Sequence, residues 1–239
     1  WNMGGMNDVL DYMQTDPDFR KGNHNKLTFS MMYAFTENYV LPISHDEVVY
    51  GKRSLIDKMP GNYEDKFANL RAFMGFMMSH PGKKLLFMGC DYGQFKEWDY
   101  KEGLEFFLKE YPLHQKLSDM NAALNKLYRE TPAFYEIEDS WDGFEWIAPD
   151  DADRNMLAYM RRDRAGNEYL VVINFSGAKA EGYRLGVPKG KYKVVFNTDN
   201  PKYGGLGEMS KRIFNTERKH SDGRENSIKM DLPKLTCLY

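Results

Sequence analysis

Tyr-Val-Leu-Pro-Ile-Ser-His-Asp-Glu, residues 39–47, is the stretch that decides the fold class. Its apolar first part, residues 39–43, is typical of a strand that is buried on both faces, and such strands belong to parallel sheets. The run ends abruptly in His45, Asp46 and Glu47. In an α/β barrel, polar residues at the carboxyl end of a strand face the active site. The stretch therefore predicts a strand that holds His45 and Asp46 at the lip of a pocket.

The first half of the chain outside this stretch indicates alternating helix and strand. Apolar residues recur at helical spacing in several segments, and Asn62 is the expected N-cap of one of them. The expected helices cover residues 6–13, 24–35, 67–77 and 113–127. A second buried strand is expected over residues 83–89, and Pro42 is expected to fray the first strand, because proline cannot donate a ladder hydrogen bond.

The second half changes character after residue 132, where short apolar runs alternate with polar turns. The expected strands cover residues 144–147, 156–161, 169–175, 183–185, 192–197, 227–232 and 236–239. About seven short strands with polar turns favour an antiparallel β-sandwich. Residues 197–222 are expected to form a loop, and the basic cluster inside it, around Lys211 and Arg218, is interpreted as a solvated surface.

Composition narrows the class of protein. The 239 residues are 42% hydrophobic and 28% charged, which is enough to bury a core. A net charge of −2 argues against a general nucleic-acid binder. No apolar run approaches the roughly 18–20 residues that cross a bilayer, so no membrane contact is expected. Cys90 and Cys237 are expected to be buried free thiols of a reducing, cytoplasmic compartment.

The polar end of the first strand limits the chemistry. Adjacent strand residues point to opposite faces, so Asp46 and Glu47 are poorly placed to flank one glycosidic bond. A glycosidase-like reaction would need further carboxylates, and Asp91 after the second strand is equally a turn residue. The His-Asp-Glu run lacks the spacing of a helical zinc motif, so neither a metal nor another cofactor is expected. A Ser-His-Asp triad stays open, although no nucleophile-elbow motif occurs.

Residues 39–52, Tyr-Val-Leu-Pro-Ile-Ser-His-Asp-Glu-Val-Val-Tyr-Gly-Lys, closely resemble the last conserved motif of bacterial 1,4-α-glucan (glycogen) branching enzymes of the α-amylase superfamily. Further stretches are also similar to that family and extend the resemblance over nearly the whole chain. They are residues 1–4, 66–72, 81–89, 142–146 and 161–163. Gly5, where the family pattern has tryptophan, and Cys90-Asp91, where it has Asn-Glu, depart from the pattern and leave the acceptor side less defined.

The resemblance implies a fold and a set of roles. Residues 1–134 would be the C-terminal portion of a (β/α)8 barrel, with its last two strands and their helices, and residues 135–239 a C-terminal β-sandwich. Asp46 would be the carboxylate that stabilises the transition state. His45 and Glu47 would bind substrate, and Trp98 would stack on a sugar, although a packed loop aromatic is the alternative. The family's nucleophilic aspartate and its acid/base glutamate lie on earlier strands.

The chain is therefore expected to be part of a glycogen branching enzyme. The intact enzyme would cleave an α-1,4-glucan such as glycogen or amylose and transfer the piece to a glucose 6-hydroxyl with retention. The chain opens at Trp1 and lacks two catalytic groups, so we expect an excised and inactive piece. Two barrel strands cannot close a barrel, so self-association is possible. The alternatives are a non-catalytic carbohydrate-binding or scaffold module and a relative with amylase or trehalose-forming activity.

Overall fold

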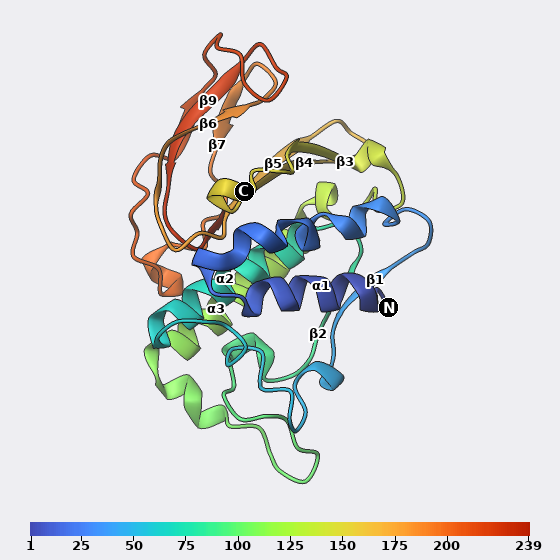
Figure 1. The fold of residues 1–239 in the computed structure, drawn as a ribbon, viewed down its shortest axis with the longest axis vertical. Coiled ribbons are helices and arrows are strands. Elements are labelled where there is room, and N and C mark those ends of the chain that lie inside the picture. Colours follow the sequence, from blue (N-terminus) through green and yellow to red (C-terminus); the bar gives the residue numbers. More distant parts are fainter.

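The computed structural model describes residues 1–239, with helices gathered in the first half and antiparallel strands in the second (Figure 1). The α-helices are α1 (Met3–Gln14), α2 (Tyr63–Ser79) and α3 (Pro112–Glu130). The strands of the first half are β1 (Val40–Ile43) and β2 (Lys83–Leu86). Those of the second half are β3 (Phe144–Ala148), β4 (Met156–Arg162), β5 (Glu168–Asn174), β6 (Ala180–Gly186), β7 (Lys191–Lys193), β8 (Ile213–Asn215), β9 (Ser227–Leu232) and β10 (Thr236–Leu238).

The first half is built around a β1–α2–β2 unit. The two strands pair in parallel, with Val40 opposite Lys83 and Ile43 opposite Leu86, as parallel strands joined by a crossover helix do. Asn62 begins α2, because its side chain accepts a hydrogen bond from the Asp65 N–H at 2.9 Å, as predicted. Asn2 caps α1 in the same way, through the Gly5 N–H. The unit directs the carboxyl ends of β1 and β2 to one edge.

Three expectations about this half are wrong in detail. Residues 24–35 form no α-helix, because polar residues interrupt the apolar spacing. Residues 24–27 and 29–32 lie in the 3₁₀ segments Pro17–Leu27 and Phe29–Met32, and residues 33–35 form a turn. Pro42 does not fray β1, because it lies within the strand. β1 pairs only with β2, so the missing N–H of Pro42 can face the unpaired edge without the loss of a ladder hydrogen bond. The second strand ends at Leu86 and is partly exposed, since no strand covers its other edge.

The second half contains antiparallel sheets that fit a β-sandwich. One sheet has the order β10–β5–β4–β3, and β6 pairs with β9 and β7 with β8. The expected loop over residues 197–222 is only partly a loop, because it contains the 3₁₀ turn Pro201–Tyr203 and the short strand β8. Its basic residues are exposed, as predicted. The two faces of β5 alternate, with Val172 in the core between the sheets and Val171 in the core toward the helices.

One continuous core joins the two halves. A cluster of 34 buried residues takes members from α1 and α2 as well as from the sheet, where Leu157, Tyr159, Val171 and Ile173 face the helices. A smaller cluster of 14 residues fills the space between the antiparallel sheets. The helical half is therefore packed on the sheet over a large apolar surface, and its helices have no separate core of their own.

Three buried arginines tie the halves together across this core. Arg20 donates to the Phe175 carbonyl at 2.7 Å, and Arg71 of α2 donates to the Thr198 carbonyl at 3.0 Å. Arg161 of β4, which is fully buried, donates to the carbonyl of Ser79, the last residue of α2, at 2.5 Å. Burial lowers the pKa of Arg20 and of Arg71 to about 10. The charges are thus met by carbonyl oxygens far away in sequence, and these bonds fix how the sheet lies on α2.

Candidate active-site edge

Three of the four predicted site residues lie on a single 3₁₀ turn, His45–Glu47, that follows β1, and the fourth, Trp98, lies in the loop after β2. Ser44 keeps the extended backbone of the strand, and the Val48 N–H closes the turn on the His45 carbonyl at 3.0 Å. The last hydrogen bond between β1 and β2 runs from the Phe87 N–H to the Ile43 carbonyl. The 3₁₀ turn begins directly after this bond, where the strand pairing ends. The three polar side chains therefore stand beyond the carboxyl end of the strand.

His45 and Asp46 both point into solvent at this edge. Their side chains are 46% and 54% exposed, and His45 Nε2 lies 3.2 Å from Asp46 Oδ1. Two aromatic rings support the imidazole: Phe87 follows β2, and Trp98 comes from the next loop, each with its ring centroid 5.9 Å from that of His45. Phe87 and Trp98 also meet edge to face at 5.1 Å. The arrangement leaves the Asp46 carboxylate exposed, with one of its oxygens beside the His45 imidazole.

Trp98 is half-buried within this aromatic group. Its backbone N–H donates to the Val48 carbonyl at 2.7 Å, so the loop of Trp98 is tied to the turn of Asp46. Packing and access to a ligand are both compatible with this position. Phe87 is a member of the site that the sequence reasoning missed, because the second strand was expected to run to residue 89 and to include it, whereas the strand ends at Leu86.

Glu97 was not singled out in the sequence, yet it anchors the loop beside the turn. Its carboxylate accepts from the Arg53 N–H at 2.6 Å and from the Gly51 N–H at 3.1 Å. Two backbone bonds to one carboxylate are a strong, charge-assisted contact. Glu97 and Trp98 thus hold in place the segment that follows Asp46, residues 48–53.

Glu47 is buried and Asp46 is exposed, but not through the strand alternation that was expected, because both lie on the 3₁₀ turn His45–Glu47, where successive side chains point about 120° apart. The residue is only 8% exposed, and its carboxylate lies 4.0 Å from the Lys52 Nζ. Lys58 is also buried nearby, and its pKa is lowered by burial and raised back in part by the charge of Glu47. Glu47 is therefore part of a polar cluster beneath the turn, where its contact is with lysines.

Asp91, the other carboxylate considered from sequence, lies in the 3₁₀ turn Cys90–Tyr92 after β2. Its backbone carbonyl accepts from the Asn121 amide at 2.7 Å, which ties this turn to α3. The turn is flanked by Gly89 and Gly93, both with positive φ, so Asp91 belongs to a tight local reversal of the chain. The side chains described above around Asp46 are those of His45, Phe87 and Trp98.

The sequence is similar to known proteins over its whole length. The chain is 48% identical over 241 residues to the 1,4-alpha-glucan branching enzyme GlgB of Halothermothrix orenii, covering 100% of this chain and 38% of that protein. The GlgB of Aquifex aeolicus gives the same identity and coverage, and that of Pseudomonas fluorescens strain Pf0-1 gives 46% with 32% of its length covered. The predicted resemblance to branching enzymes is confirmed. The chain spans about a third of the length of these relatives.

The fold comparisons agree with the second half in particular. The family model described as "Alpha amylase, C-terminal all-beta domain" matches residues 146–239. An alpha-amylase from H. orenii superimposes with a TM-score of 0.60 at 13% identity, covering 99% of this chain and 47% of that one. A Group B Streptococcus pullulanase gives 0.53 at 16% identity, covering 73% and 28%. At such identities the likeness concerns the fold alone.

Three other properties bear on the predictions. Both cysteines are buried and free, as predicted. No group of three or more His, Cys, Asp or Glu side chains is arranged to hold a metal ion. None of the helices combines the length and apolar composition needed to span a membrane.

Proposed function

We propose that this chain supplies one wall of the active site of a 1,4-α-glucan branching enzyme, with Asp46 as its transition-state-stabilising carboxylate. The observation that carries the proposal is the exposed Asp46 on the turn after β1, set beside His45 in a chain similar throughout to branching enzymes. A carboxylate at this edge would bind sugar hydroxyls and stabilise the positive charge that develops on the ring.

The remaining site residues take roles that follow from their exposure. His45 offers an exposed nitrogen beside Asp46 and would bind substrate through it. Trp98 would present the free part of its ring to a sugar, since aromatic faces suit the apolar faces of hexoses. The burial of Glu47 favours a positioning role under the turn over the direct contact with glucan expected from sequence.

We also propose that residues 1–134 are the closing portion of a (β/α)8 barrel and residues 135–239 a C-terminal β-sandwich. The parallel β1–β2 pair with its crossover helix α2 supports the first part, and the antiparallel sheets support the second. The exposed Leu86 and Met88, at 36% and 52%, lie along β2 and just beyond it, and would be covered by further barrel strands or by a second copy of the chain.

Activity would require the two carboxylates that retaining glycoside chemistry needs in addition to Asp46. The chain alone should therefore leave the iodine absorbance of amylose unchanged. Replacing the matching 241 residues of the Halothermothrix orenii enzyme by this chain should give an active chimera. In that chimera, Asp46→Asn should lower kcat at least about a hundredfold, in the range of a removed electrostatic stabiliser.

Asp99→Asn is the matched control, because Asp99 is an exposed carboxylate near Trp98 that accepts only from the Lys101 N–H among its side-chain bonds. It should leave branching within about twofold, as a surface substitution does. A chimera that branches amylose equally well with asparagine at position 46 would refute the assignment of Asp46. Amylose branching by the 239-residue chain alone would refute the need for further carboxylates.

The second candidate is a non-catalytic carbohydrate-binding or scaffold module. It is favoured by one observation, that the polar contact of Asp46 at this edge is with His45 and not with a second carboxylate. Co-sedimentation of the whole chain with glycogen distinguishes the two kinds of module. Protein in the glycogen pellet indicates a binding module, and protein left in the supernatant indicates a scaffold.

A further inference from the structure

The 3₁₀ turn that carries Asp46 is held at both of its ends. Before the turn, the Phe87 N–H donates to the Ile43 carbonyl at 2.8 Å. After the turn, the Trp98 N–H donates to the Val48 carbonyl at 2.7 Å. Both donors belong to the part of the chain that follows β2. The position of the turn therefore depends on how firmly the chain after Val48 is bound to the loop around Trp98.

The chain after the turn has a backbone conformation that is costly to keep. Gly51 has a φ of 82° and Arg53 a φ of 64°, both in the left-handed region. For a residue with a side chain, such as Arg53, this conformation brings the Cβ close to a carbonyl oxygen and costs free energy. Sparsely populated conformations persist only where the surrounding contacts enforce them. Residues 51–53 therefore need a contact that holds them.

Glu97 supplies that contact. One oxygen of its carboxylate accepts from the Arg53 N–H at 2.6 Å, and the other accepts from the Gly51 N–H at 3.1 Å. Backbone N–H groups of a turn that includes left-handed residues converge in this way and form a concave site for a carboxylate. The conformation of residues 51–53 and the Glu97 carboxylate thus stabilise each other.

Glu97 and Trp98 are adjacent, so two successive residues hold one stretch of chain. Trp98 binds it directly after the turn through its backbone, and Glu97 binds it at Gly51 and Arg53 through its carboxylate. Without the Glu97 carboxylate, Trp98 alone would hold the stretch, and the end of the Asp46 turn would be free to shift. A shift of about 1 Å in a group that acts on the transition state can lower the rate about a hundredfold.

We propose that Glu97 is a positioning residue for the branching reaction. The inference rests on the proposed function, in which Asp46 is the transition-state-stabilising carboxylate. Glu97 acts through Asp46, because it keeps residues 48–53 in place and with them the end of the turn from which Asp46 reaches the glucan. Its own carboxylate is occupied by two backbone bonds, so its role requires no contact with the substrate.

The structural part of the proposal is tested on the 239-residue chain by amide hydrogen exchange. Glu97→Gln keeps the size of the side chain but replaces one acceptor oxygen by an NH₂ group, which cannot accept from an N–H. The amides of Gly51 and Arg53 should then exchange at least about tenfold faster, because local opening becomes easier. The amide of Leu70, in the buried part of α2, should keep its exchange rate and report that the fold as a whole is intact.

The catalytic part is tested in the chimera with the Halothermothrix orenii enzyme. Glu97→Gln should lower kcat about tenfold and change KM by less than about twofold, since a displaced Asp46 is missed mainly in the transition state. In an Asp46→Asn chimera the same substitution should lower kcat by less than about twofold further, because effects that pass through one shared group do not add. A residue that only stabilised the fold would lower the activity equally in both backgrounds.

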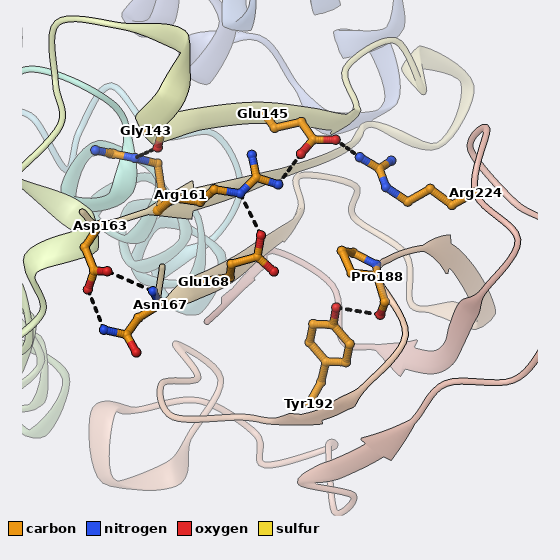
Figure 2. A network of polar contacts seen from close by, with 10 residues as sticks. Gly143, Glu145, Arg161, Asp163, Asn167, Glu168, Pro188, Tyr192 and Arg224 are labelled. Atoms are coloured by element: carbon orange, nitrogen blue, oxygen red, sulfur yellow. Dashed lines mark hydrogen bonds and ion pairs between the residues drawn. The ribbon is translucent and has the colours of Figure 1, made fainter. Parts of the chain in front are cut away.

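Two other glutamates are the matched controls. Glu102 lies on the same loop and is paired with a lysine there. Glu168 lies in the sandwich, in the chain of ion pairs that includes Glu145 (Figure 2), with its carboxylate 2.6 Å from Arg162. The partners of these two carboxylates are side chains and not the backbone of residues 48–53. Glu102→Gln and Glu168→Gln should therefore leave kcat and KM within about twofold of the parent chimera.

Three outcomes would overturn the inference alone. The first is an unchanged exchange rate of the Gly51 and Arg53 amides in Glu97→Gln. The second is a chimera in which Asp46→Asn lowers kcat and Glu97→Gln does not, and the third is an equal loss of kcat from Glu97→Gln in both backgrounds. A chimera that keeps its kcat with Asp46→Asn would refute the proposed function itself, and this inference with it.

Discussion

Arg161 should be one of the most costly single positions in the chain to replace. Its guanidinium is fully buried and donates to the Gly143 carbonyl at 3.1 Å and to the Ser79 carbonyl at 2.5 Å. Each hydrogen bond from a charged donor is worth about 1.5–3 kcal/mol, and the abandoned carbonyls would stay buried. Relief of the buried charge offsets part of that sum. Arg161→Met should therefore cost roughly 3 kcal/mol of unfolding free energy.

The neighbouring Arg162 provides the matched control on the same strand. Its side chain is 26% exposed and pairs with Glu145 and Glu168, which are themselves about a third exposed. Partly exposed ion pairs contribute about 0–1 kcal/mol each, so Arg162→Met should cost about 1 kcal/mol. Urea unfolding followed by far-UV circular dichroism and by tryptophan fluorescence measures both variants. Equal costs for the two substitutions would refute the view that the buried carbonyl bonds hold the halves together.

Three further outcomes are expected. Burial holds the pKa of His80 at about 3, so between pH 6.5 and 3 the unfolded chain binds a proton that the folded one does not. Stability should fall by about 2 kcal/mol from pH 7 to pH 5, and by less in His80→Gln, as urea midpoints at both pH values would show. Gly205→Ala should cost at least about 2 kcal/mol, because its Cβ would meet the Asp199 carbonyl carbon and oxygen at 2.1 Å, whereas Gly103→Ala, with open space around it, should be near neutral in thermal melts. The buried Cys90 thiol, whose pKa is raised to about 12, should react with a disulfide reagent only as fast as the protein opens, and rapid labelling would contradict that.

Elements whose signals are local were predictable from the sequence. α2 was found through its apolar spacing and its Asn62 cap, and β1 through an apolar run that ends in polar residues. β8 was missed because it has three residues in a basic, polar stretch, and its partner residues in β7 lie 20–24 positions away, beyond any local pattern.

The site follows the same division. Asp46 is exposed and Glu47 is buried because of their places on the 3₁₀ turn after β1, and the alternation expected of adjacent strand residues does not apply there. The support from Glu97 could not be predicted, because its partners at residues 51 and 53 come close only through the tertiary fold. The burial of the three arginines could not be predicted either. Arg20 lies in a 3₁₀ segment, Arg71 in α2 and Arg161 in β4, and a charged residue in any of these patterns is usually exposed.

The core shared by helices and sheet has a practical meaning for anyone who wishes to study the sandwich by itself. The strand face that carries Leu157, Tyr159, Val171 and Ile173 packs on helices that come earlier in the chain, among them α2 (Tyr63–Ser79). A recombinant fragment that starts at residue 135 would expose this apolar surface to solvent and would tend to aggregate. Residues 1–134 and 135–239, produced as two separate chains in one cell, should associate through this shared core.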